Sequence, residues 1–209
     1  MPQPLLVFDT NILIDILLGR DGDAAVLLVE LAEQQRVELV VPEYVLFEFR
    51  GTALRWVRDQ LHRLGSIRQY ANEWARAAEL DQPAATIKGA ANDLEEKLKA
   101  IQAEIESVES RIRSVARIAA HTPELHFRGD LRYLAGRPPD RPVDGLKDCR
   151  IYEAVLEILT NDQATPRPRY LVTHDSDFDF PELEAELQSL GTSIRKDPGK
   201  LYGELRSPK

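Results

Sequence analysis

The chain has 209 residues, and 43% of them are hydrophobic, which is enough for one domain with an ordinary core. No uncharged run approaches the roughly 18–20 residues of a membrane helix, the N-terminus lacks a signal-peptide pattern, and the single cysteine excludes a disulfide framework. We therefore expect a cytoplasmic protein without membrane contact, and the net charge of −8 disfavours a nucleic-acid partner unless cations neutralise the acidic regions.

The first fifty residues alternate between strand and helix patterns. Leu5–Phe8 is a short, continuous apolar run, as in a buried strand, and Asp9 follows at its end. Amphipathic helices are predicted after Asp9 and over residues 24–31, and a strand over residues 37–41. Pro42 is expected in the first turn of the next helix, where its missing N–H costs nothing. This order is typical of a parallel α/β sheet.

A different pattern fills residues 51–142. Apolar residues recur there at alternating intervals of four and three, which is the heptad spacing of packed helices. The downstream series is Ile87, Leu94, Leu98, Ile101, Ile105, Val108, Ile112 and Val115, and the upstream series is Leu54, Val57, Leu61 and Leu64. Residues 81–83 break the two series, so we predict a long antiparallel hairpin, with one amphipathic helix on the sheet as the alternative. Residues 121–144, with several Gly and Pro, are expected to be a loop.

The strand and helix rhythm resumes after this insertion. We predict a helix over residues 147–159, a strand over 170–173, a helix over 181–190 and an edge strand over 192–194. The predicted fold is thus one α/β domain with a twisted parallel sheet flanked by helices, formed by residues 1–50 and 143–209. The helical hairpin and its loop, residues 51–142, interrupt it.

Acidic side chains follow two of the predicted buried strands. Asp9 ends the first, and Asp175 and Asp177 come directly after the strand over residues 170–173. Helix capping is the simplest explanation of one such acid. It does not explain two strands that deliver acids to the same sheet edge, which is where open parallel sheets build their sites.

Two predicted helices contribute further acids. Glu48 has apolar neighbours on both sides, where an unpartnered carboxylate is costly, and Asp148 opens the helix over residues 147–159. Each has a rival. Glu43 lies in the first turn of its helix, where it complements the helix dipole, and Asp144 precedes Gly145 in a turn pattern.

Clustered carboxylates repel one another and raise each other's pKa unless cations neutralise them. Hard oxygen ligands without a His or Cys cluster favour Mg²⁺ or Mn²⁺. Two such ions can clamp a phosphodiester and activate a water for in-line attack. An acidic site filled in this way accepts a polyanion.

Four blocks of the sequence together resemble the PIN domain nucleases, and in particular a longer branch with a helical segment between the second and third blocks. They are VFDTNILID, VVPEYVLFEF, KDCRIYEAVLEI and YLVTHDSDF. The resemblance covers about residues 1–50 and 143–195. It implies an endoribonuclease that uses Mg²⁺ or Mn²⁺, with RNA as the partner, and a site made of the catalytic, metal-binding acids Asp9, Glu48, Asp148 and Asp175.

The same resemblance assigns supporting roles. Asp177 is expected to be a further metal-site acid, and Asn11 and Thr173 match polar positions that steady the first and fourth acids. The long insertion departs from the small toxin members of the family. A toxin role with a protein inhibitor, an RNA-processing role and a homodimer therefore all stay open.

Two other functions compete with this one. A haloacid-dehalogenase-type phosphatase needs a second acid two residues after the first, and that position is Asn11. A catalytically idle PIN-like module, which would bind RNA or a protein through its hairpin, has no use for clustered negative charge. We therefore expect an active nuclease.

The insertion is expected to govern substrate choice or assembly rather than chemistry. Residues 51–140 contain 14 Lys or Arg against 13 Asp or Glu, whereas the rest contains 13 against 22. The arginines of the helical segment are by default expected to form a solvated face, with RNA contact by some of them as the alternative; they include Arg55, Arg58, Arg63, Arg111, Arg113 and Arg117. Elsewhere Cys149 is expected in the core, His174 beside the substrate and Asp179 in a turn.

Overall fold

The computed structural model describes residues 2–20, 23–139 and 145–206, and the rival acid Asp144 lies outside these ranges. The elements within them are, in chain order, β1 (Leu5–Phe8), α1 (Thr10–Leu18), α2 (Ala24–Glu33), β2 (Glu38–Pro42), α3 (Glu43–Trp74), the 3-10 turn η2 (Ala78–Leu80), α4 (Asp81–Val115), β3 (Arg117–Ala119), α5 (Pro123–Leu134), α6 (Gly145–Asn161), β4 (Arg169–Val172), the 3-10 turn η3 (Ser176–Phe178), α7 (Pro181–Ser189), β5 (Thr192–Arg195) and α8 (Pro198–Arg206).

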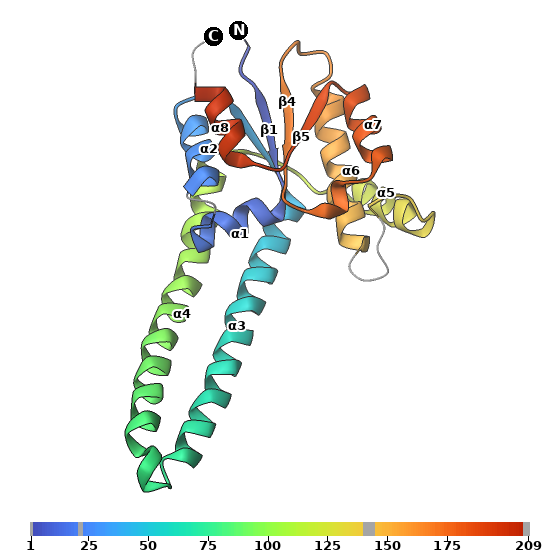
Figure 1. Cartoon of the computed structure of the whole chain (residues 1–209). Helices are drawn as coiled ribbons and strands as arrows, with labels where there is room; N and C mark the ends of the chain where they lie inside the picture. The colour runs from blue at the N-terminus through green and yellow to red at the C-terminus, as the bar shows by residue number, and fades with distance from the viewer. Residues whose placement is uncertain (1, 21–22, 140–144, 207–209) are drawn as a thin grey trace. The chain divides into compact units, whose positions relative to one another are not determined.

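All five strands form one parallel sheet in the order β3-β2-β1-β4-β5 (Figure 1). β1 is the central strand, and its Leu5 is in register with Glu38 of β2 and Arg169 of β4. All four β1 side chains are buried, because helices cover both faces of a parallel sheet. This burial explains why the sequence of β1 is an unbroken apolar run. The predicted parallel α/β fold is confirmed.

The strand order reverses at β1. β2 and β3 extend the sheet to one side of it, and β4 and β5 extend it to the other. At such a point the connections leave in opposite directions, which opens a crevice beyond the carboxyl ends of the two neighbouring strands. The crevice is formed here by β1 and β4, the two strands after which the predicted acids come.

Helices pack on both sides of this sheet. α2 packs against α8, and α5 packs against α6 on the other side in the view of Figure 1. α7 contacts the edge strand β5. No helix in the described ranges is long and apolar enough to cross a membrane.

The chain divides into two compact units. Unit 1 comprises Met1–Phe49 and Val108–Lys209, and unit 2 comprises Arg50–Ser107, which are the outer lengths of α3 and α4. Unit 2 has its own apolar cluster of Val57, Leu64, Ala91 and Leu98. Its ion pairs join Arg50 to Glu106 and Arg68 to Glu95, so the two helices run antiparallel. The predicted hairpin is therefore present, and the single-helix alternative is wrong.

The prediction of a loop over residues 121–144 is wrong for the first half of this range, because the helix α5 occupies Pro123–Leu134. The sequence does contain the usual signals of a helix start, although the Gly and Pro content of the segment obscured them. Thr122 caps α5 by accepting a hydrogen bond from the Leu125 amide, and Pro123 follows in the first turn. Gly129 is not a turn residue. A Cβ there would lie 2.6 Å from Arg150 Cγ, so glycine allows α5 to pack closely on α6.

Smaller differences concern the ends of elements. Pro42 closes β2, and the next helix begins one residue later at Glu43. The strand β3 and the helix α8 were not predicted. β3 has only three residues, Arg117–Ala119, and none of them is buried, so it lacks the apolar run that marks the inner strands.

Candidate active site

Asp9 lies at the carboxyl end of β1 and caps α1. Its Oδ1 accepts a hydrogen bond from the Thr10 amide at 2.6 Å, and its Oδ2 accepts from Asn11 Nδ2 at 3.0 Å and from Thr173 Oγ1 at 2.7 Å. The side chain is buried. The capping explanation is thus correct as far as it goes, but one oxygen also receives two side-chain donors, which fix the carboxylate in one orientation.

Thr173 joins the two strands at this edge. Its hydroxyl donates to Asp9 and accepts from Asn11 Nδ2 at 3.1 Å and from the Asp175 amide at 3.0 Å. A hydroxyl has one donor and two acceptor sites, so all its bonding capacity is used. Asn11 completes the link, because its Oδ1 accepts from the His174 amide. Asn11 and Thr173 therefore link Asp9 to the segment that holds Asp175.

Asp175 and Asp177 occupy the short segment after β4. Asp175 Oδ1 accepts from the Asp177 amide at 2.8 Å, which starts the η3 turn and buries Asp177. Lys196, directly after β5, donates to the main-chain carbonyl of Asp175 and pairs with Asp179 at 2.7 Å. This lysine ties the end of a third strand to the segment that holds the acids.

The structure separates Glu48 from its rival Glu43. Glu48 Oε2 accepts a hydrogen bond from Thr10 Oγ1 at 2.5 Å, next to Asp9, and its other oxygen lies 3.8 Å from Lys147 Nζ. Glu43 accepts instead from the amide of His121, the residue that comes two positions after β3. Five residues along a helix correspond to about 140° of rotation, which is why the two carboxylates point to different places.

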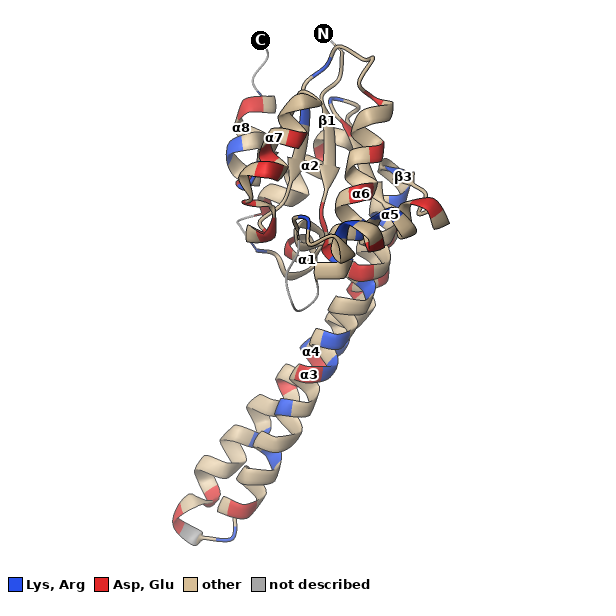
Figure 2. Ribbon diagram, turned by 90° about the vertical axis from the view of Figure 1, so that its right-hand side faces the viewer, with Lys and Arg blue, Asp and Glu red and all other residues tan. Residues whose placement is uncertain are grey.

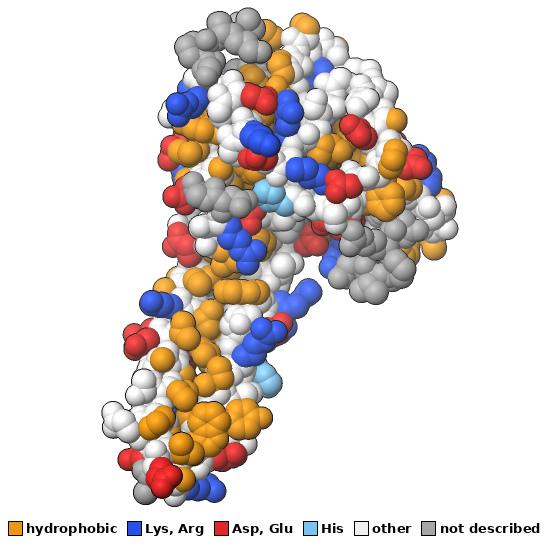
Figure 3. Space-filling model, viewed as in Figure 1, with side chains coloured by type: hydrophobic (Ala, Val, Ile, Leu, Met, Phe, Trp, Pro, Cys, Tyr) orange, Lys and Arg blue, Asp and Glu red, His pale blue; other side chains and the backbone are white. Residues whose placement is uncertain are grey.

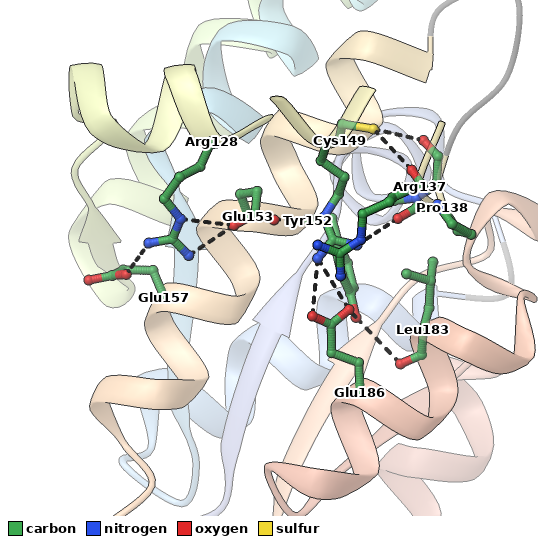
Figure 4. Close-up of polar contacts among 11 residues, drawn as sticks. Arg128, Arg137, Pro138, Cys149, Tyr152, Glu153, Glu157, Leu183 and Glu186 are labelled. Atoms are coloured by element: carbon green, nitrogen blue, oxygen red, sulfur yellow. Dashed lines mark hydrogen bonds and ion pairs between the residues drawn. The ribbon is translucent and has the colours of Figure 1, made fainter. Parts of the chain in front are cut away.

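Asp148 lies in the first turn of α6, and salt bridges join that helix to α5. Glu153, five residues further along α6, forms ion pairs with Arg132 at 2.6 Å and with Arg128 at 2.9 Å (Figure 4). Arg132 is almost fully buried, and it also binds Glu186 of α7 and the carbonyl of Pro138. α5, α6 and α7 are thereby held as one block behind Asp148.

The acids share one electrostatic environment. In Figure 2 acidic segments surround the carboxyl end of β1, beside α1. Burial raises the pKa of Asp9 from 3.8 to about 6, against the lowering effect of its hydrogen bonds, and Glu48 and Asp175 raise it further. The pKa of Asp148 rises from 3.8 to about 7, first through burial and then through the charges of Glu48, Asp175, Asp177 and Asp9. Each predicted acid therefore lies within electrostatic reach of Asp148.

The residues suit a hard divalent cation. In the part of the chain that the structure describes, no three His, Cys, Asp or Glu side chains form a preformed metal centre. Carboxylates that repel one another are expected to stay apart until a cation draws them in. The donor set is made only of carboxylate oxygens, which Mg²⁺ and Mn²⁺ prefer, and the raised pKa of Asp148 shows negative charge in need of neutralisation.

Comparison with known proteins decides the family. A family model described as PIN domain matches residues 6–178, which is most of the chain. The chain belongs to the PIN domain family. No curated protein and no solved structure matches it. PIN domains are typically nucleases that act on nucleic acids, and they generally use Mg²⁺ or Mn²⁺.

In this PIN domain the matched span runs through the hairpin and ends at Phe178, the last residue of η3. All five predicted acids, together with Asn11 and Thr173, thus fall inside it. Among the other predicted residues, Cys149 is buried in the core as expected, with its thiol against the Pro139 carbonyl. His174 contacts Asp15 at 3.0 Å, and Asp179 is exposed.

Three site residues of the PIN domain were missed in the sequence. Thr10 binds Glu48, Lys147 lies beside the same carboxylate, and Lys196 holds the Asp175 segment. The role of Lys196 could have been predicted, since this residue directly follows a strand that ends at the same sheet edge as the acids. Of the arginines for which RNA contact is the alternative to a solvated face, Arg111, Arg113 and Arg117 each form an ion pair with a glutamate.

Proposed function

We propose that this PIN domain is a Mg²⁺- or Mn²⁺-dependent endoribonuclease that hydrolyses phosphodiester bonds within RNA. The observation that supports it most is Asp148, whose pKa is raised to about 7 first by burial and then by the charges of four other acids. A structural role would favour a partner arginine, as at Glu153, over this accumulation of like charge.

Asp9, Glu48, Asp148 and Asp175 would hold the cation, with Asp177 in support. A bound cation neutralises charge on the phosphate and activates water for attack. The chain's own contribution is orientation, because Thr173 and Asn11 fix Asp9, and Thr10 fixes Glu48. Preorganised ligands of this kind need no rearrangement when the charged transition state forms.

Protonation supports the same assignment. With a pKa of about 7, the Asp148 carboxyl of the metal-free protein holds a proton about half of the time at neutral pH. A cation bound there must displace that proton, because ligands bind metals in their deprotonated form. Metal affinity is therefore expected to rise between pH 6 and pH 8.

The test compares two glutamates five residues apart on one helix. Glu48→Gln should reduce cleavage of a single-stranded RNA in Mn²⁺ by at least a hundredfold, whereas the matched control Glu43→Gln should retain wild-type activity. EDTA should abolish cleavage by the wild type. Full activity of Glu48→Gln, or cleavage that persists in EDTA, would contradict the proposal.

Metal binding is measured separately from activity. A cation that binds only the folded state adds about 2.7 kcal/mol of stability at a hundred times its dissociation constant. Mn²⁺ should therefore raise the melting temperature of the wild type and of Glu43→Gln, and raise that of Asp148→Asn much less. Stabilisation without any cleavage would instead favour an idle module that binds RNA or a protein.

A further inference from the structure

The hairpin of unit 2 has two unlike faces. Val57, Leu64 and Ala71 of α3 are buried at seven-residue intervals, and Ala84, Ala91, Leu98 and Ile105 of α4 repeat this. These two rows face each other, since residues seven apart return to nearly the same side of a helix. Because the helices are antiparallel, positions three residues after a buried one fall on one common face of the hairpin, and positions four residues after fall on the other.

The second face is polar and internally satisfied. Arg68 and Glu95, each four residues after a buried position, form an ion pair at 2.5 Å. Lys99 joins the same glutamate at 2.7 Å, and Arg68 also donates to Asn92 at 2.8 Å. This pairing across the helices confirms the assignment of faces, and it leaves no need for a partner on that side.

The first face is apolar and largely uncovered. We call it the apolar face, and it consists of Trp56, Ile67, Tyr70 and Trp74 on α3 and Ile87, Leu94 and Ile101 on α4. Tyr70 is 57% exposed and Leu94 is 50% exposed. Figure 3 shows a continuous row of hydrophobic side chains over α3 and α4. Exposed apolar rows of this length on soluble proteins mark interaction surfaces.

We propose that the apolar face binds the same face of a second copy of this chain, so that two hairpins form a four-helix bundle. Charge supports a second copy as the occupant. Arg50–Ser107 contains nine Lys or Arg and nine Asp or Glu, so two hairpins carry no net charge that would make them repel each other. A polyanion such as RNA gains nothing from a neutral surface with an apolar centre.

Charges of both signs also border the apolar face. By their helical positions Arg63 and Lys97 lie at its edges, together with Glu73 and Glu104. No ion pair joins any of these four to another described residue, in contrast to the paired charges of the polar face. A rim of mixed sign around an apolar centre is complementary to itself.

The size of the apolar face is sufficient. From Trp56 to Trp74 a helix rises about 27 Å, and two adjacent helices are about 20 Å wide. The apolar face is therefore about 500 Å² per copy, or about 1,000 Å² in total, which reaches the lower limit of specific protein interfaces. Heptad spacing at Ile87, Leu94 and Ile101 supplies the regular side-chain rows that four-helix bundles interlock.

The substitutions Leu98→Lys and Ile105→Lys are unsuitable tests, because both side chains are buried inside the hairpin. The full chain, freed of nucleic acid, should instead be a dimer by multi-angle light scattering at 50 µM and should remain so in 1 M NaCl. Tyr70→Glu combined with Leu94→Glu should yield monomers with an unchanged helical circular dichroism signal. The matched control is Leu54→Glu, which is 38% exposed and lies three residues before Val57, on the side of the polar face, and it should remain dimeric.

A monomeric wild type, or a Tyr70→Glu, Leu94→Glu variant that dimerises as well as the wild type, would overturn the proposal. Equal loss of dimer in Leu54→Glu would do so too. If the double variant lost its helical signal, Tyr70→Ser would decide the question, because it removes apolar area without adding charge. Its dimer dissociation constant should rise at least tenfold, and an unchanged constant would overturn the proposal.

Discussion

At the scale of single residues, one buried hydroxyl connects the two halves of the candidate site. Thr173 reaches Asp9, Asn11 and the Asp175 amide, and it is completely buried. Thr192 on the neighbouring strand β5 is buried as well. Its hydroxyl has no hydrogen-bond partner within the described ranges. Both threonines are therefore buried, but only the hydroxyl of Thr173 forms hydrogen bonds within the described ranges.

We expect Thr173→Val to lower the free energy of unfolding by about 1–3 kcal/mol, since it leaves the Asp175 amide and Asn11 short of an acceptor. Cleavage should fall about tenfold or more because Asp9 loses a donor that fixes it. Thr192→Val is the control and should hold or gain stability, as it removes an unsatisfied polar atom. Urea unfolding of both variants checks this, and equal destabilisation would refute the assigned role of Thr173.

The raised carboxyl pKa values predict how stability of the metal-free protein depends on pH. The folded state keeps a proton on Asp9 and Asp148 that the unfolded chain has already released near pH 4. Raising the pH from 5 to 8 should therefore lower the free energy of unfolding by about 1 kcal/mol through Asp9 and by about 3 kcal/mol through Asp148, because only the part of each pKa shift above pH 5 falls in this window. His121, whose pKa is lowered first by burial, acts in the opposite direction.

The variant Asp148→Asn isolates the carboxyl contribution. It should be more stable than the wild type at pH 8 and show a flatter profile, while the histidine contribution is common to both proteins. Saturating Mn²⁺ should flatten the wild-type profile as well. Parallel stability profiles for the two metal-free proteins would mean that the surroundings of Asp148 do not raise its pKa.

How far the sequence predicts this site depends on the kind of residue. Asp9 and Asp175 are predictable, because any acid directly after a buried parallel strand reaches the same edge. The preference for Glu48 over Glu43 comes mainly from the family resemblance, since its apolar neighbours alone leave the rival open. Thr10 and Lys147 are not, because their roles depend on contacts between segments far apart in the sequence. A short polar residue near a helix start is too common to signal such a contact.

At the scale of elements, α6 depends on one arginine of α5. Arg132→Met should cost about 3–5 kcal/mol, because it leaves Glu153 and Glu186 without their buried counterion. A chain of this size should then melt about 6–15 °C lower. Arg128→Met is the control, since this half-exposed side chain also pairs with Glu153, and it should cost less than about 1 kcal/mol.

Calorimetry would measure the two melting temperatures. Equal shifts of the melting temperature in the two variants would show that burial of Arg132 does not increase its contribution to stability. The same element shows the limit of sequence reasoning, because α5 was expected to be a loop. The Gly129 that suggested a turn is there for a close helix contact, and only the position of Arg150 on another helix reveals this.

At the scale of the whole molecule, the two units have separate apolar cores, so the hairpin should be removable. Arg50 and Glu106 lie 3.8 Å apart, and replacing Arg50–Ser107 by a short Gly-Ser linker should join ends that are already close. The shortened chain should keep the unit 1 fold and cleave a short unstructured RNA in Mn²⁺. Circular dichroism and the cleavage assay check this, and an unfolded product would show that the hairpin stabilises unit 1.

The pairing of β1 with β4 also determines when the site can exist during synthesis. A ribosome adds about 5–20 residues per second, so Asp175 follows Asp9 by roughly 10–30 s. Until Arg169–Val172 has been made, the nascent chain has the central strand of its sheet but lacks β4, its partner on one side, and also lacks Asp175 and Asp177. The four acids can therefore come together only after the segment that follows β4 has been made, because it is the last of the contributing segments in chain order.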